Sequence, residues 1–133
     1  MIHKISINTK SHTEFIDISS EITSIVKKSD VKNGMAVIYI PHTTAAITIN
    51  ESADPAVVSD IINTLENLVP WSGRYRHVEG NAAAHIKSAI MGSSVNVMIE
   101  DGSLSLGTWQ GIFFCEFDGP RSRKIIINII KSS

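Results

Sequence analysis

The final third of the chain holds four strand-like segments with no helix-forming segment between them. Turn sequences such as Asp101-Gly102 and Asp118-Gly119-Pro120 separate them, and the predicted strands span 95–99, 104–106, 109–117 and 124–130. Parallel neighbours in a sheet need a long crossover connection, usually a helix. These segments therefore predict an antiparallel meander, and they exclude a wholly parallel sheet with alternating helices.

Three helices are predicted upstream of this meander. Each begins at a residue that can cap a helix N-terminus, namely Ser19, Asp54 and Asn81. Proline at the first helical position, Pro55, strengthens the second helix, and Gly92 ends the third. The helices are predicted at 19–28, 55–69 and 82–91.

The remaining strands are predicted as two adjacent pairs. Apolar residues alternate with polar ones through 3–18, and the polar stretch 9–13 suits a hairpin turn. Strands at 35–40 and 44–50 form the second pair, joined around His42. The sequence therefore predicts one α+β domain over residues 1–133, a mixed, mostly antiparallel sheet with about three helices on one face.

The composition predicts a protein that associates with itself. Of the 133 residues, 43% are hydrophobic and 19% charged, and the mean hydropathy is +0.11. Some apolar surface is therefore expected to be covered by another subunit. With a net charge of -1, the protein has no overall positive electrostatic field that would attract it to nucleic acid or to an anionic membrane. With one cysteine and no apolar run that resembles a signal peptide or a membrane span, we expect a cytoplasmic protein.

Three of the five histidines lie where functional side chains concentrate, in loops or near a helix start. His42 follows a strand, His77 lies in the loop before the third helix, and His85 lies in the first turns of that helix. Three convergent imidazoles suit a zinc ion with one open water position. Their spacing matches no short metal motif, so the residues alone favour a simpler interpretation, with His77 in an ordinary loop and His85 on the helix surface.

Carboxylates accompany these histidines in the sequence. Glu51, after the strand that ends at Asn50, is a candidate metal ligand or general acid or base, whereas Asp54 is explained by capping. Glu116 lies inside an apolar strand. It therefore faces a site, pairs with a cation, or lies on a strand face open to solvent.

Several groups are candidates for binding an anion, although the chain has neither a P-loop nor a dinucleotide-binding glycine motif. They are hydroxyls, a helix N-terminus and two cations: Thr43, Thr44, residues 103–108, the helix that begins at Asn81, Arg121 and Arg123.

An ordered set of short motifs along the chain resembles the YjbQ family. They are His42-Thr43-Thr44-Ala45, Asn50-Glu51 with Asp54-Pro55, Tyr75-x-His77, Glu79-Gly80-Asn81, His85-Ile86-Lys87, Gly107-Thr108-Trp109-Gln110, and the closing Glu116, Asp118-Gly119-Pro120-Arg121 and Arg123. The resemblance covers nearly the whole chain. It implies a homotrimer with a polar pocket that draws on His42, Asn50, Glu51, His77, His85, Gln110 and Glu116.

The family is identified with secondary thiamine-phosphate synthase activity. The resemblance therefore implies an enzyme for a small phosphorylated or heterocyclic metabolite, which joins a hydroxymethylpyrimidine pyrophosphate to a thiazole phosphate. It makes His42, His77 and His85 proton carriers or ligands of a divalent metal, zinc or magnesium, with Glu51 or Glu116 as acid or base. The substrate would meet Thr43, Thr44, Asn50, Asn81, Gln110, Arg121 and Arg123. Two alternatives stay open: a metal-dependent hydrolase with a histidine-bound water, and a non-catalytic metabolite-binding trimer.

Overall fold

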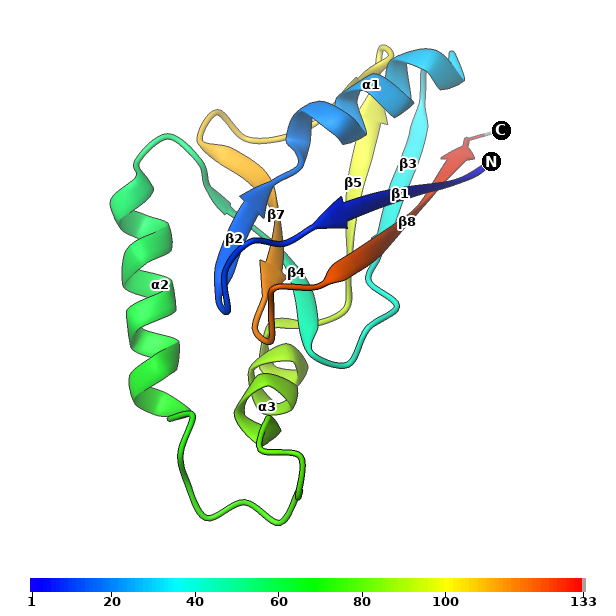
Figure 1. Ribbon diagram of the computed structural model, residues 1–133. Coiled ribbons are helices and arrows are strands. Elements are labelled where there is room, and N and C mark those ends of the chain that lie inside the picture. Colours follow the sequence, from blue (N-terminus) through cyan, green and yellow to red (C-terminus); the bar gives the residue numbers. More distant parts are fainter. Residues whose placement is uncertain (133) are drawn as a thin grey trace.

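Two antiparallel β-sheets, packed face to face, form the body of the molecule (Figure 1). The structure is a computed structural model, and it describes residues 1–132. Sheet A has the strand order β1-β8-β3-β5-β6, with the bounds Ile2–Asn8, Ser122–Lys131, Gly34–Tyr39, Ser94–Glu100 and Ser103–Leu104. Sheet B has the order β2-β7-β4, with the bounds Glu14–Asp17, Gln110–Glu116 and Ala45–Glu51.

The main core lies between the two sheets. Because side chains alternate along a strand, one face of each sheet turns apolar residues inward. Ile127 of sheet A and Ile47 and Phe114 of sheet B are all buried there. Helix α1 (Ser19–Ser29) adds Ile22 to the same core, and it packs near β6, β7 and β8.

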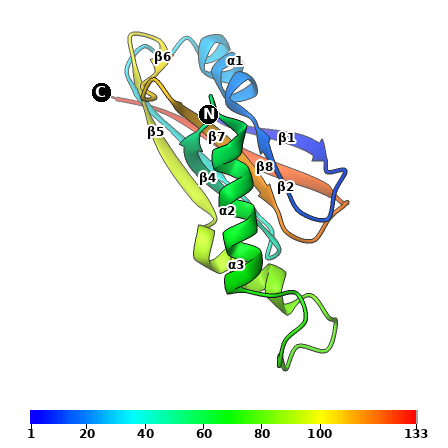
Figure 2. The same cartoon turned by 90° about the vertical axis from the view of Figure 1, so that its left-hand side faces the viewer.

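A second, smaller core lies on the other face of sheet B. Phe113 and its strand neighbours contact Leu65 of α2 (Pro55–Leu68) and Ala84 of α3 (Ala82–Met91). Figure 2 shows α2 in front of the strands of sheet B. The molecule therefore has three layers, sheet A, sheet B and the helices α2 and α3. A single α+β domain with three helices is confirmed for the described residues, and their strand pairings are all antiparallel.

Among the described strands, every connection between successive strands except β5–β6 passes from one sheet to the other. The predicted hairpin at 9–13, the predicted strand pair around His42 and the continuous meander are therefore wrong. Alternation shows which residues face inward, but two sheets that share a core satisfy that pattern equally well. Three short crossings, at residues 9–13, 40–44 and 117–121, lie at the same end of the sheets. We call them the cavity-end crossings.

The helix caps agree with the sequence at one of three positions. Asp54 Oδ1 accepts a backbone N–H of the first turn of α2 at 2.9 Å, as predicted. Ser19 Oγ instead accepts the Ile112 amide at 2.9 Å, and Asn81 Nδ2 donates to Asp118 Oδ2 at 2.9 Å. These two side chains join neighbouring elements rather than closing their own helices.

The outer face of sheet A keeps a row of apolar side chains at the surface. Met35 pairs with Met98 on one side and with Ile130 on the other, and the last two are exposed. Tyr39, on the same strand as Met35, is also exposed. Within residues 1–132, no helix has both the length and the apolar composition needed to cross a membrane.

Candidate functional site

An open cavity of about 880 Å³ lies between two of the cavity-end crossings, 40–44 and 117–121, the helix α3 and the loop that precedes α3. The crossing after β3 supplies His42, the loop supplies His77, and α3 supplies His85. The structure thus brings together eight of the predicted site residues: His42, Thr43, Thr44, His77, Asn81, His85, Arg121 and Arg123.

A smaller hollow of about 370 Å³ adjoins this cavity. His42, Thr43, His85 and Ser93 line both. His42 and His85 therefore lie where the two spaces meet, together with Thr43 and Ser93.

His77 and His85 form a close pair on the side of the cavity opposite the sheets. Their ring centroids lie 5.1 Å apart in an edge-to-face arrangement, and Glu79 Oε2 lies 3.7 Å from His77 Nε2. His77 and Glu79 are exposed, so solvent and ligand can reach them. In the described part of the chain, no three His, Cys, Asp or Glu side chains are arranged to hold a metal ion.

His42 is held by the backbone of β8. Its Nε2 accepts the Lys124 amide N–H at 2.9 Å. Burial of the ring, together with the positive charge of Arg123, lowers the pKa of His42 below its ordinary value. The neutral imidazole is therefore the favoured form near pH 7. A three-histidine metal site stays a prediction, and it would require His42 to give up this hydrogen bond.

Glu116 and Arg123 form a buried ion pair beneath the cavity. Glu116 is 0% exposed and Arg123 5%. Arg123 Nε donates to Glu116 Oε1 at 2.8 Å, and Arg123 Nη2 donates to Oε2. Thr9 Oγ1 also donates to Oε1 at 2.8 Å, and the Asp118 amide donates to Oε2 at 2.9 Å. Both carboxylate oxygens are thus occupied, and neither reaches solvent.

These contacts determine the charge of Glu116. Burial raises the pKa of its carboxyl group, but the hydrogen bonds from Arg123, the Asp118 amide and Thr9 lower it by more, so the pKa lies below its ordinary value. Glu116 is therefore ionised, with its charge compensated by Arg123. This geometry is typical of a structural ion pair, whereas a general acid needs a proton and contact with substrate.

Arg123 also holds the crossing that carries His42. Its Nη2 donates to the carbonyl oxygen of Thr44 at 3.2 Å and to Thr44 Oγ1 at 2.9 Å. The ion pair therefore joins all three cavity-end crossings, through Thr9, Thr44 and the Asp118 amide. The hydroxyl of Thr44 and the carboxylate of Glu116 are both used in this internal network.

Arg121 is the more accessible of the two predicted cations. Its Nη2 lies 3.0 Å from Asp118 Oδ2, and its Nε donates to the Asp118 carbonyl at 2.8 Å. The same carboxylate oxygen accepts Asn81 Nδ2. Because the Arg121 side chain is 53% exposed, it can meet an anion in the cavity, whereas Arg123 is 5% exposed and already pairs with Glu116.

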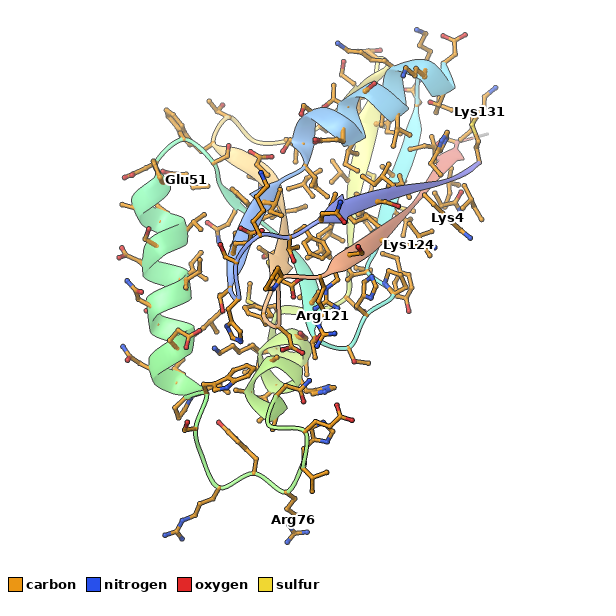
Figure 3. The ribbon with its side chains drawn as sticks, in the orientation of Figure 1. Lys4, Glu51, Arg76, Arg121, Lys124 and Lys131 are labelled. Atoms are coloured by element: carbon orange, nitrogen blue, oxygen red, sulfur yellow. The ribbon has the colours of Figure 1, made fainter. Side chains whose placement is uncertain are left out.

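Three predicted site residues lie at the opposite end of sheet B. Asn50 pairs with Gly111 and Glu51 with Gln110, whereas Thr44, which lines the cavity, directly precedes Ala45 at the start of the same strand. Six residue steps along a strand correspond to about 20 Å. Figure 3 shows Glu51 and Arg121 at these two ends. The structure therefore does not bring Asn50, Glu51 and Gln110 to the histidines of the same chain.

The cavity also has lining residues that the sequence interpretation did not include in the site. Asp118 orients Arg121 and Asn81, and its position in the turn before Arg121 was the available signal. Glu79, two residues from His77, was a candidate carboxylate and part of the Glu79-Gly80-Asn81 motif, although it was not assigned a role in the site. Tyr39 and Ser93 gave no signal, because the antiparallel pairing of β3 with β5 brings them to the cavity.

Comparison with known proteins gives consistent relatives over the full length. The family described as UPF0047 protein YjbQ-like matches residues 3–132. A UPF0047 protein of Methanocaldococcus jannaschii is 54% identical over 98% of this chain and 94% of its own, and YugU of Bacillus subtilis is 47% identical over 98% and 99%.

Solved structures agree with this result. A YjbQ/UPF0047 family protein from Clostridium acetobutylicum has a TM-score of 0.95 at 53% identity, covering 96% of this chain and 99% of its own. A YbjQ-like protein of unknown function from Sulfolobus solfataricus has a TM-score of 0.95 at 33% identity, covering 99% and 97%. The chain therefore belongs to the YjbQ-like UPF0047 family.

Proposed function

We propose that this protein is an enzyme that acts on a small phosphorylated or heterocyclic metabolite in the cavity of about 880 Å³. The observation that carries the proposal is the convergence of His42, His77 and His85 on one open space beside the exposed cation Arg121. The reaction to test first is the condensation of a hydroxymethylpyrimidine pyrophosphate with a thiazole phosphate.

The cavity offers groups for each part of that reaction. The thiazole nitrogen forms a bond to the methylene carbon of the pyrimidine, the carbon–oxygen bond to pyrophosphate breaks, and inorganic pyrophosphate leaves. Arg121 would stabilise the negative charge on the leaving group. His77 and His85, which lie side by side, would exchange protons with the phosphate oxygens.

The test is formation of thiamine phosphate from the two substrates, followed by chromatography, with and without added Mg²⁺. We expect His85→Ala to lower the rate by about 100-fold or more, the usual contribution of a proton-transfer group. Ile86→Ala is the matched control, since Ile86 is exposed on the same helix and does not line the cavity. A wild-type rate in His85→Ala would contradict the assignment, provided that both variants have the wild-type circular dichroism and mass.

A metal-dependent hydrolase is the second candidate, and the grouping of His77, His85 and Glu79 favours it. As they are arranged, the described residues do not fit a metal site of three ligands, so no step above is assigned to a metal. Hydrolysis of a panel of phosphoesters that a chelator stops and zinc restores would replace the first proposal with this one. Saturable binding of both thiamine precursors without turnover would instead indicate a metabolite-binding protein.

We further propose that the protein works as a homotrimer in the cytoplasm. The exposed apolar row on sheet A supports the association, since a contiguous patch of this kind is typical of an interaction surface. A trimer would also allow Asn50, Glu51 and Gln110 to contribute to a ligand site. In such an assembly, the end of sheet B that carries them in one subunit would adjoin the cavity of another subunit.

A further inference from the structure

Both ring nitrogens of His42 have defined roles in this structure. An amide N–H can only donate, so Nε2, which accepts it from Lys124, carries a lone pair. The proton of the neutral ring therefore lies on Nδ1. Nδ1 has no hydrogen-bond partner within residues 1–132, yet it is not among their buried unpaired atoms, so it keeps accessible surface, and the residue that carries it lines the cavity.

This arrangement leaves His42 one chemical role toward a ligand. A general base or a metal ligand needs a free lone pair on the imidazole, and the single lone pair of this tautomer is already engaged by the Lys124 amide. What the ring offers to the cavity is an N–H group. Such a group donates to a phosphate, carboxylate or carbonyl oxygen, and a neutral ring does so without first taking up a proton.

The buried ion pair maintains this geometry. Lys124 follows Arg123 directly in β8, and His42 precedes Thr44 by two residues. Arg123 Nη2 donates to both the carbonyl and the hydroxyl of Thr44, while Glu116 accepts from Nε and from the same Nη2. One guanidinium therefore sets the spacing between the segment that carries His42 and the amide that selects its tautomer.

We propose that His42 is a fixed, neutral hydrogen-bond donor, through Nδ1–H, to an oxygen acceptor on the ligand, and that Arg123 and Glu116 are its positioning residues. This inference rests on the proposed function only in taking the cavity as the ligand site. It leaves proton transfer to His77 and His85, and it leaves Arg121 as the cation that meets an anion.

The tautomer can be read directly by long-range ¹H–¹⁵N correlation spectra of protein labelled with ¹⁵N-histidine. Loss of one set of signals in His42→Gln assigns the residue. We expect the pattern of a single tautomer protonated on Nδ1 at pH 7. A ring protonated on Nε2, or on both nitrogens, would overturn the donor assignment.

Addition of zinc alone separates this role from that of a metal ligand. We expect the His42 signals to stay in place while zinc is added, since the Nε2 lone pair is engaged. A zinc-dependent shift of His42 Nε2 at one ion per chain, with loss of the Lys124 amide hydrogen bond, would contradict the inference.

The positioning role is tested with Glu116→Gln, which keeps the shape of the side chain but weakens its hold on Arg123. We expect the single tautomer of His42 to become a mixture, an effect that a merely structural residue would not produce. Ser122→Ala is the control, because Ser122 is exposed on the same strand and its hydroxyl donates to Asn8 Oδ1, away from the ion pair.

If Glu116→Gln does not fold, Thr9→Val removes one hydrogen bond to Glu116 and should produce a smaller change in the same direction. An unchanged tautomer in a folded variant would refute the positioning role. The readout is independent of turnover: failure to form thiamine phosphate counts against the proposed function and leaves these spectra as they are.

Discussion

At the scale of single residues, burial separates polar side chains that support the cavity from those that can act in it. Glu116 and Thr44 resemble site residues in the sequence, yet their polar atoms are engaged in the network around Arg123. His85 and Arg121 remain accessible beside them. The sequence shows that these residue types cluster along the chain. It does not show which of these side chains use their hydrogen-bonding groups on one another and which remain free to meet a ligand.

The two shifted groups of this network predict how stability depends on pH. His42 has a folded-state pKa below its ordinary value of 6.5, and Glu116 has one below 4.5. In both cases the unfolded chain binds its proton first as the pH falls, so acidification favours unfolding. We expect the free energy of unfolding to decrease below pH 6.5 through His42, and to decrease further below pH 4.5 through Glu116.

Urea unfolding at a series of pH values from 7.5 to 4 checks this expectation. His42→Gln keeps an acceptor for the Lys124 amide but does not titrate, so its stability should change less between pH 7 and 5 than that of the wild type. Identical pH dependence in the two proteins would show that His42 is protonated equally in the folded and unfolded states.

At the scale of elements, the helices were predictable and the strand partners were not. Asp54-Pro55 is a local signal for a helix start, since it acts within the first turn of α2 alone, and α2 begins there in the structure. Strand pairing depends on residues far away in the chain: β1 pairs with β8, and β2 with β7. A period of two in hydrophobicity specifies a face, whereas the neighbour is selected by packing of the whole core.

An ion pair between a buried lysine and a partly exposed glutamate joins α2 to α3 and allows a test at this scale. Lys87 of α3 is 1% exposed, and its Nζ lies 2.7 Å from Glu66 Oε1 on α2, whose side chain is 40% exposed. Glu66→Gln leaves a buried ammonium without its counter-charge, whereas Lys87→Met removes the charge and leaves Glu66 in contact with water. We therefore expect Glu66→Gln to lower the free energy of unfolding by about 2 kcal/mol, and Lys87→Met to lower it by less.

Chemical denaturation of both variants shows whether the charge of Lys87 or the packing of its side chain contributes more to stability. If Lys87→Met is the more destabilising, then packing of the long lysine side chain, rather than its charge, holds the two helices together.

At the scale of the whole molecule, the uncovered face of sheet A predicts association. Light scattering should give a mass of three times 14.5 kDa. Met98→Lys with Ile130→Lys places charges in the exposed apolar row and should lower that mass, while Lys27→Glu, at the exposed end of α1, should not. A trimer that persists in the double variant would move the interface to another surface.

The three cavity-end crossings also determine when a growing chain can have a site. Thr9 and Glu116 are separated by 107 residues, and Thr44 and Arg123 by 79, yet all four meet in one network. During synthesis, the first two crossings leave the ribosome long before the residues that hold them, because Arg123 and Lys124 belong to the last strand. A nascent chain that stops before β8 therefore has its histidines but lacks the arginine and the amide that hold His42, so we expect the cavity to form only after β8 has been made.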